Sequence, residues 1–231
     1  MSKISYKRHR FSAEVIQHAV WLYFRFTLIF RDVEDLLAER GLDVFCESVR
    51  YWVLKFRAEY ARKIDHRRPR PNYRWHRDEV FVSINGKRVY LWRAVDDEGE
   101  VLEVLVQSRR NRVSALKLMR KLLKKQGFSP SAIVTDKLPS YGAALRDLGL
   151  SKCHDFGERK NNRAENSHLS IRRRERKMQK FKSPGSAQRF LSIHASVHNL
   201  FNTQRHLISR TILRQFRDAA MSEWRYVTIA G

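Results

Sequence analysis

The chain has 231 residues, of which 42% are hydrophobic and 11% aromatic, so it can bury one sizeable core or two smaller ones and is not a wholly disordered protein. Its 47 Lys and Arg residues against 24 Asp and Glu residues give a formal net charge of +23 at pH 7. Such a charge indicates a polyanionic partner, and nucleic acid is the first candidate because basic side chains release the counterions condensed on phosphates.

An anionic membrane is the competing polyanion, and several features disfavour it. The chain opens without a signal peptide or lipidation motif, and its apolar stretch at residues 19–30 is short and interrupted by Arg25. Cys46 and Cys153 lie far apart without a CxxC partner, which favours a reducing compartment and gives no zinc signature. We therefore expect a cytoplasmic protein that associates with nucleoid DNA and not with a membrane.

The first 60 residues predict a basic tail, at residues 1–10, followed by three helices. Ser12 suits the N-cap of the first helix, whose apolar residues recur at helical spacing. The second helix is expected at Asp32 to Arg40 and ends at Gly41, and the third begins near Glu47 or Ser48. Helix, glycine turn and helix are typical of a helix-turn-helix domain.

In a helix-turn-helix domain, the second helix of the pair can enter the major groove of DNA. Here that helix would expose Arg50, Tyr51 and Lys55, which we take as candidate DNA-binding residues. The plain alternative is a three-helix bundle with no DNA-binding role. Residues 61–74, rich in Lys and Arg and broken by two prolines, are expected to form a linker, either a solvated hinge or an arm along DNA.

From Trp75 the pattern changes to strands, and we assign residues 75–205 to a second domain and 206–231 to a C-terminal tail. Strands are predicted at 78–84, 89–95, 101–106 and 132–135, with a hairpin turn at Asn85 and Gly86. Helices are predicted at 113–126, 141–148, around Glu165 and at 186–201. This order is typical of an RNase H-like α/β fold with a mixed five-stranded sheet.

Three carboxylate residues occupy positions in the predicted strands and helices from which their side chains could meet. Asp78 lies on the first strand, Asp136 directly follows the fourth, and Glu165 lies on a later helix. The first and fourth strands are neighbours in an RNase H-like sheet, so the two aspartates can meet, and a packed helix can bring the glutamate to them. Clustered carboxylates suit Mg²⁺ or Mn²⁺, and two such ions can clamp the attacking and leaving oxygens of a phosphoryl transfer.

Each carboxylate also has an ordinary interpretation. Asp78 could be a solvated charge at a strand start, Asp136 a turn residue, and Glu165 a carboxylate favoured by the helix dipole. The surrounding segments carry more information: WHRDE at 75–79, YLWRAVD at 90–96, TDK at 135–137, NNRAENSH at 161–168 and FKS at 181–183. In this order they closely resemble the insertion sequence six family of bacterial DDE transposases, over nearly the whole chain.

The resemblance implies that Asp78, Asp136 and Glu165 form a catalytic triad that binds Mg²⁺ or Mn²⁺, with two ions expected. It also implies binding to the terminal inverted repeats of the element and to target DNA, and replicative transposition through cointegrates. We expect a homodimer or larger assembly, because two DNA ends must be held together. A catalytically inactive DNA-binding copy is the alternative, and a nuclease acting on hybrids is a third possibility that leaves the helix-turn-helix unexplained.

Basic residues near the expected site are candidates for contacts with DNA phosphates. His168 lies one turn after Glu165 and so shares its helix face. The remaining candidates are Arg109, Arg110, Arg112, Lys137, Arg172, Arg173, Arg174, Arg176 and Lys177. A basic run of this kind can also be a solvated helix face.

Overall fold

The chain divides into two compact units in a computed structural model that describes residues 4–136, 139–156, 162–178, 180–203 and 207–229. The helical unit comprises residues 1–68 and 196–231, and the sheet unit comprises residues 69–195. No helix in the described part of the chain is both long and apolar enough to cross a membrane.

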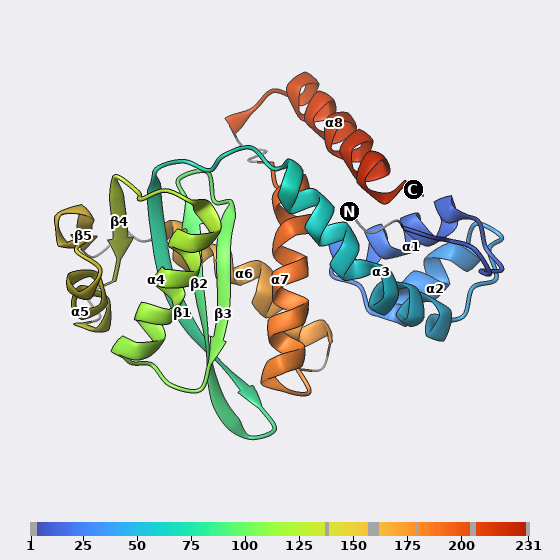
Figure 1. The fold of residues 1–231 in the computed structure, drawn as a ribbon. Coiled ribbons are helices and arrows are strands. Elements are labelled where there is room, and N and C mark those ends of the chain that lie inside the picture. Colours follow the sequence, from blue (N-terminus) through green and yellow to red (C-terminus); the bar gives the residue numbers. More distant parts are fainter. Residues whose placement is uncertain (1–3, 137–138, 157–161, 179, 204–206, 230–231) are drawn as a thin grey trace. The chain divides into compact units, whose positions relative to one another are not determined.

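The helical unit contains the three helices predicted from the sequence, namely α1 (Ala13–Arg25), α2 (Phe30–Ala38) and α3 (Cys46–Arg67) (Figure 1). Both α1 and α2 pack against α3, and each turns a stripe of apolar residues inward. Asp32 secures the start of α2, because its carboxylate accepts a 3.0 Å hydrogen bond from the backbone N–H of Ile29. Ser12 occupies the N-cap position of α1, but its side chain makes no capping hydrogen bond.

Helix α3 is longer than the sequence pattern predicted and includes the first half of the expected linker. Ala61 and Ile64 are both buried, which continues the helical spacing of the apolar residues before them. The helix ends at Arg67, just before the first proline at residue 69. The linker expectation is therefore wrong for residues 61–67.

The C-terminal segment is also helical and is not the tail expected from the sequence. Helix α8 (Arg210–Thr228) begins after Ser209, whose side chain accepts a hydrogen bond from the backbone N–H of Ile212. Trp224 and Val227 are buried on the side that packs against α3. Residues 207–229 therefore complete the core of the helical unit.

The sheet unit is built on a five-stranded mixed sheet. Its strands are β1 (Arg74–Ile84), β2 (Lys87–Asp96), β3 (Val101–Gln107), β4 (Ala132–Thr135) and β5 (His154–Phe156), in the order β3-β2-β1-β4-β5. The first three strands form antiparallel pairs, whereas β4 is parallel to both β1 and β5. This arrangement confirms the expected RNase H-like architecture, with β5 as the strand that the sequence pattern did not locate.

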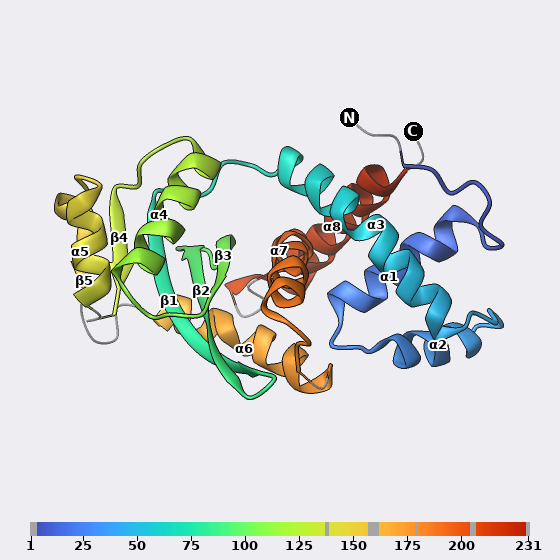
Figure 2. The ribbon, with the colours of Figure 1, turned by 60° about the horizontal axis from the view of Figure 1, so that its bottom comes forward.

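Helices cover both faces of the sheet, as Figure 2 shows for α4 (Arg112–Gln126) and α6 (Asn162–Lys177) on opposite sides. Helix α5 (Pro139–Asp147) packs beside α4, and a 3-10 turn, η1 (Ser151–Cys153), precedes β5. The core between the sheet and α4 is fully buried and includes Trp75, Trp92, Leu118, Met119 and Leu122. Trp75 and Trp92 are the largest side chains of this core.

Helix α7 (Pro184–Phe201) begins in the sheet unit, where it protects the free edge of β3. The amide side chain of Gln188 accepts a 2.8 Å hydrogen bond from the N–H of Val106 and donates one of 2.9 Å to the carbonyl of Val104. These bonds occupy backbone groups that would otherwise be open to pairing with another strand.

Candidate metal centre and nucleic-acid interface

The pairing of β1 with β4 brings two of the predicted carboxylates together. Arg77 lies opposite Thr135 in the parallel register, so the residues that follow them, Asp78 in β1 and Asp136 just after β4, are neighbours. Oxygen atoms of Asp78, Asp136 and the unpredicted Glu79 all lie within 4.8 Å of one another. We call these three residues the acidic cluster.

Glu79 was missed by the sequence analysis because it adjoins Asp78 on a strand, where successive side chains point to opposite faces. Its side chain is only 1% exposed, against 32% for Asp136. The hydroxyl of Tyr141 in α5 donates a 2.6 Å hydrogen bond to its Oε2. Burial raises the pKa of Glu79, and the nearby charge of Asp136 adds to this, while the hydrogen bond from Tyr141 opposes it.

Arg110 bridges two members of the acidic cluster. Its Nε donates to Oε1 of Glu79 at 2.5 Å, and its Nη2 lies 3.4 Å from Oδ2 of Asp136. The guanidinium side chain is 42% exposed, so it reaches the buried carboxylate from the solvent side. One cation therefore partly neutralises two carboxylates that would otherwise repel each other.

Helix α6 approaches the acidic cluster from the face of the sheet opposite to α4 (Figure 2). Nε2 of His168 lies 3.5 Å from Oδ2 of Asp78, and both side chains are largely buried. Burial lowers the pKa of His168 to about 3, helped by the positive charges of Arg93 and Arg172. The imidazole is therefore neutral near pH 7, which makes its approach to Asp78 a polar contact and not an ion pair.

Arg93 contributes a buried positive charge on the same side of the sheet. It lies directly opposite Asp78 in the antiparallel register of β1 and β2, so the two side chains share a face. It is only 1% exposed, and burial lowers its pKa to about 9. A cation next to Asp78 favours the ionised form of that carboxyl group.

Glu165, the third predicted carboxylate, lies in α6 three residues before His168, but its side chain is outside the described part of the structure. Lys137, a predicted phosphate contact, also lies outside the described residues. The oxygen ligands of the acidic cluster fit a hard divalent cation such as Mg²⁺ or Mn²⁺, which prefers carboxylates to nitrogen or sulfur ligands.

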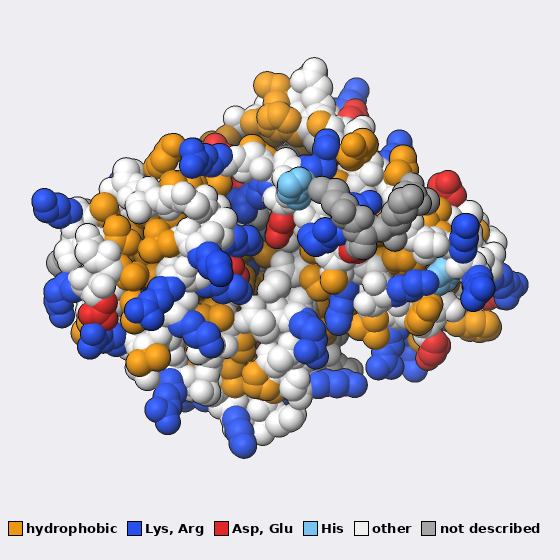
Figure 3. Space-filling view, in the orientation of Figure 1, with side chains coloured by type: hydrophobic (Ala, Val, Ile, Leu, Met, Phe, Trp, Pro, Cys, Tyr) orange, Lys and Arg blue, Asp and Glu red, His pale blue; other side chains and the backbone are white. Residues whose placement is uncertain are grey.

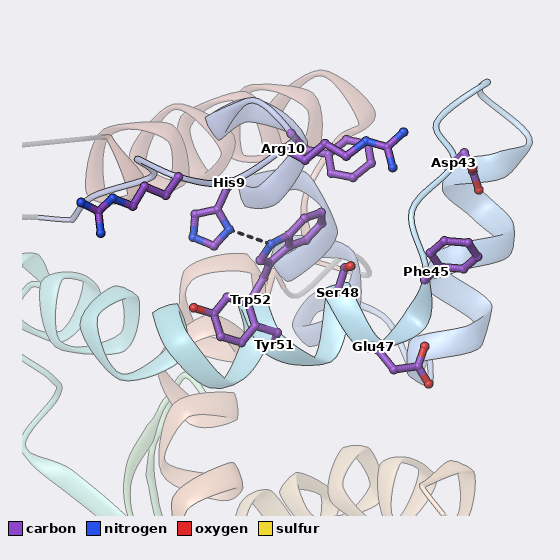
Figure 4. Close-up of a pocket in the computed structure, with 10 residues that line it drawn as sticks. His9, Arg10, Asp43, Phe45, Glu47, Ser48, Tyr51 and Trp52 are labelled. Atoms are coloured by element: carbon purple, nitrogen blue, oxygen red, sulfur yellow. Dashed lines mark hydrogen bonds between the residues drawn. The ribbon is translucent and has the colours of Figure 1, made fainter.

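The predicted DNA-binding residues of the helical unit lie on the solvent side of α3. Arg50, Tyr51 and Lys55 are all exposed, and Tyr51 keeps 54% of its surface accessible. Figure 4 shows Tyr51 beside Trp52 at the rim of a hollow formed with residues of the N-terminal segment. The exposed side of α3 therefore offers charged and aromatic groups to a partner.

The basic candidates of the sheet unit differ in their surroundings. Arg112 makes a bidentate ion pair with Asp147, in which Nε donates to Oδ2 at 2.7 Å and Nη2 donates to Oδ1 at 2.6 Å. The Arg112 side chain remains 60% exposed. Five further candidates are exposed, and their contact with DNA stays a prediction: Arg109, Arg172, Arg173, Arg176 and Lys177. On the face drawn in Figure 3, Lys and Arg side chains are far more frequent than Asp and Glu.

Arg174 and His168 do not fit the prediction that they contact DNA from the surface. Arg174 is 1% exposed, with its guanidinium 5.5 Å from the ring centre of Phe190, because its side chain turns into the core. His168 is 2% exposed and lies beneath Asp78. We therefore remove Arg174 from the candidate DNA contacts and treat His168 as a residue that packs against the acidic cluster.

Comparison with known proteins gives consistent matches over most of the chain. Residues 72–204 match a protein family described as a DDE domain. The transposase for insertion sequence-like element IS431mec of Staphylococcus aureus strain Mu50 is 32% identical over 184 residues, covering 78% of this chain and 81% of that protein. The transposase for insertion sequence element IS257 in transposon Tn4003, also from Staphylococcus aureus, is 30% identical over 184 residues with the same coverage.

Among solved structures, the catalytic core domain of BIV integrase aligns with 66% of this chain and 99% of its own, at 16% identity and a TM-score of 0.40. The DDE-domain match spans more than half of the chain, and both transposases are at least 30% identical over 81% of their own length. This chain belongs to the insertion sequence six family of DDE transposases.

Proposed function

We propose that this chain cuts the ends of its own insertion sequence and joins their 3′-hydroxyls to target DNA, using Asp78, Asp136 and Glu165 as metal ligands. The observation that carries the proposal is the convergence of Asp78 and Asp136, 58 residues apart in sequence, within 4.8 Å of each other, Asp78 inside β1 and Asp136 directly after the neighbouring β4. Carboxylates repel one another, so convergence of this kind is typical of a functional site.

Helix α6 supports the inclusion of Glu165. The helix packs against β1 and β2, and His168 on it comes to 3.5 Å from Asp78. Residues three apart on a helix share a face, and Glu165 precedes His168 by three residues. We assign it as the third ligand, one helical turn from the residue that already touches the acidic cluster.

Bound Mg²⁺ or Mn²⁺, in a two-ion site, would activate the attacking hydroxyl and stabilise the leaving oxygen. The protein's own residues hold the ligands in place. Tyr141 and Arg110 fix both carboxylate oxygens of Glu79, and neutral His168 packs beneath Asp78 without introducing a competing positive charge. Glu79 lies beside the two aspartates as an additional carboxylate, and its ionised form would add to the negative charge of the site.

Double-stranded DNA is the proposed partner, both as the terminal inverted repeats of the element and as the target. The helix-turn-helix would bind the repeats through Arg50, Tyr51 and Lys55, and exposed basic residues of the sheet unit would contact backbone phosphates. A homodimer or larger assembly would hold two ends together, and replicative transposition through cointegrates would follow. We expect this activity in the bacterial cytoplasm, on nucleoid DNA.

A strand-transfer assay on a supercoiled plasmid that carries the element ends tests the proposal. Wild-type protein with Mg²⁺ should give cleaved and joined products, and Asp136→Asn should give none while still shifting the same DNA in a gel. Asp97→Asn is the matched control, because Asp97 is an exposed acid that contacts His76 and lies outside the acidic cluster. Equal activity in the wild type and Asp136→Asn contradicts the proposal, and inactivity of both proteins identifies a DNA-binding copy without catalysis.

A further inference from the structure

The N-terminal segment, residues 4–11, lies along α3 and is held there by specific contacts. Ile4 is 3% exposed. The hydroxyl of Tyr6 donates a 2.5 Å hydrogen bond to the carbonyl of Thr228 in α8 and lies 2.6 Å from the hydroxyl of Tyr60 in α3. The ring of Tyr6 also packs 4.9 Å from that of Phe56. A basic segment expected to be a loose tail is thus part of the helical unit's packing.

His9 fixes the segment beside the exposed side of α3. The indole N–H of Trp52 donates a 3.2 Å hydrogen bond to Nδ1 of His9, the dashed line in Figure 4. The ammonium of Lys55 lies 2.8 Å from Nε2, and the ring of Tyr51 lies 5.7 Å from the imidazole. Two of the three α3 residues assigned to DNA binding therefore contact this segment.

The residues on either side of His9 are exposed cations. Arg8 and Arg10 are both exposed, as is Lys7. Arg8 adopts φ of 64°, a left-handed conformation that disfavours a residue with a Cβ atom and persists where the surroundings impose it. In Figure 4, His9 turns toward Trp52 while Arg10 extends away from it. The packing of one residue thus presents its two charged neighbours to solvent.

A hollow of 360 Å³ lies between this segment and the start of α3. Its walls combine charge and exposed aromatic surface, since Phe45 is 60% exposed and Tyr51 54% exposed. Two acids, Asp43 and Glu47, also line it. Arg8 and Arg10 line the hollow as well, and Lys7, Arg50 and Lys55 are further exposed cations on the same segment and helix. This excess of positive charge favours a polyanion as the partner of the surface.

We propose that residues 7–10 and the exposed side of α3 form one DNA-binding surface, in which Arg8 and Arg10 contact backbone phosphates of the duplex that α3 reads. Phosphate contacts set the position of a protein on DNA, while base contacts specify the sequence. The docked segment thereby sets how α3 sits on the duplex. The proposal rests on the DNA-binding part of the proposed function but not on its catalytic part.

The test measures binding of the full-length protein to a fluorescein-labelled, mixed-sequence 24-base-pair duplex by anisotropy, without divalent metal, from 50 to 300 mM NaCl. The double variant Arg8→Ala/Arg10→Ala should bind about 10-fold or more weakly at 100 mM NaCl. Its plot of log affinity against log salt should be shallower by about 1 to 2, because each lost phosphate contact removes about 0.9 from the slope. Arg214→Ala/Arg217→Ala removes the same charge from exposed positions on α8 and serves as the control.

A second variant tests the placement of the cations. His9→Ala keeps the formal charge at pH 7.5, yet it should also lower affinity and the salt slope, with an unchanged far-ultraviolet circular dichroism spectrum. The proposal is overturned if the Arg8/Arg10 variant behaves like the α8 control, the result expected if this surface serves an acidic protein instead. It is likewise overturned if His9→Ala binds as the wild type does. Because no step of the assay requires metal, failed strand transfer leaves this result unaffected.

Discussion

Tyr141 of α5 and Glu79 of the acidic cluster, 62 residues apart in sequence, are joined by a 2.6 Å hydrogen bond. Both side chains are almost completely buried, and the phenolic O–H donates to a carboxylate oxygen. Burial raises the pKa of each group, as expected where water cannot solvate the charged form. The bond ties α5 to β1 at the site where the aspartates meet.

Removal of the Tyr141 hydroxyl should destabilise the protein. In Tyr141→Phe the buried oxygen of Glu79 loses its donor, and such a loss costs about 2 kcal/mol when the acceptor is charged. Urea unfolding followed by far-ultraviolet circular dichroism measures the change. Tyr73→Phe is the control, because Tyr73 is 52% exposed, and it should unfold within about 0.5 kcal/mol of the wild type. Equal stabilities for the two variants would contradict the role of this hydrogen bond.

Arg110 should compete with divalent cations for the acidic cluster, because it already bridges Glu79 and Asp136. Arg110→Ala should melt a few degrees lower than the wild type without metal, since the carboxylates then repel one another uncompensated. It should gain more than the wild type from 10 mM Mg²⁺, because a ligand that binds the folded state more tightly stabilises it more. Differential scanning fluorimetry with and without Mg²⁺ measures both effects.

The control for Arg110 is its neighbour Arg109, which is also exposed. Arg109→Ala should show the same gain from Mg²⁺ as the wild type. If Arg110→Ala gains no more than Arg109→Ala does, the guanidinium does not compete with metal for these carboxylates.

Glu165→Gln should reduce strand transfer at least about 1,000-fold, a loss typical of removing a group that stabilises the transition state. Glu175→Gln is a matched control on the same helix, ten residues further along α6. It should retain activity within about threefold of the wild type. The quantified products of the plasmid assay decide between them, and comparable losses in the two variants would show that α6 matters for folding and not for its proposed ligand.

Acid should weaken the anchoring of the N-terminal segment through His9. Burial, followed by the charge of Lys55, lowers the pKa of His9 below its ordinary 6.5, while the rings of Tyr51 and Phe56 also face it. The folded state thus favours the neutral ring, which can accept the N–H of Trp52. The stabilisation is complete above pH 6.5 and is lost as the pH falls through 6.5 toward the lower pKa of the folded state.

Melting temperatures of the wild type and His9→Ala at pH 7.5 and pH 5.5 test this dependence. At pH 7.5 the wild type should melt a few degrees higher than His9→Ala, which is the effect of about one hydrogen bond. This difference in melting temperature should shrink at pH 5.5. A difference that stays the same or grows in acid would show that the neutral imidazole is not what holds the segment.

Local sequence signals predicted much of the sheet unit correctly. Asn85 and Gly86 take φ values of 52° and 74°, as a two-residue hairpin turn requires, so this turn could be located from two letters. The strand at 132–135 has the predicted bounds, and its position next to β1 explains why Asp78 and Asp136 could be named in advance.

The structural features that the sequence did not predict depend on residues that are distant in the chain. Strand β5 has three residues, too few for a periodic pattern, and it exists because it pairs with β4. Helix α8 and the end of α3 are stabilised by packing against each other. Glu79 could not be distinguished from a solvated strand residue, because its burial depends on Tyr141 and Arg110, both remote in the sequence. Arg174 is likewise buried, although a run of basic residues usually indicates an exposed helix face.

Asp78, Asp136 and Glu165 are proposed to hold divalent cations together, and anomalous diffraction from crystals of this protein soaked in Mn²⁺ would locate those cations. We expect an anomalous peak bonded to carboxylate oxygens of Asp78 and Asp136, with Glu165 completing the site. A map with no peak at these residues, or with manganese bound only elsewhere on the protein, would contradict it.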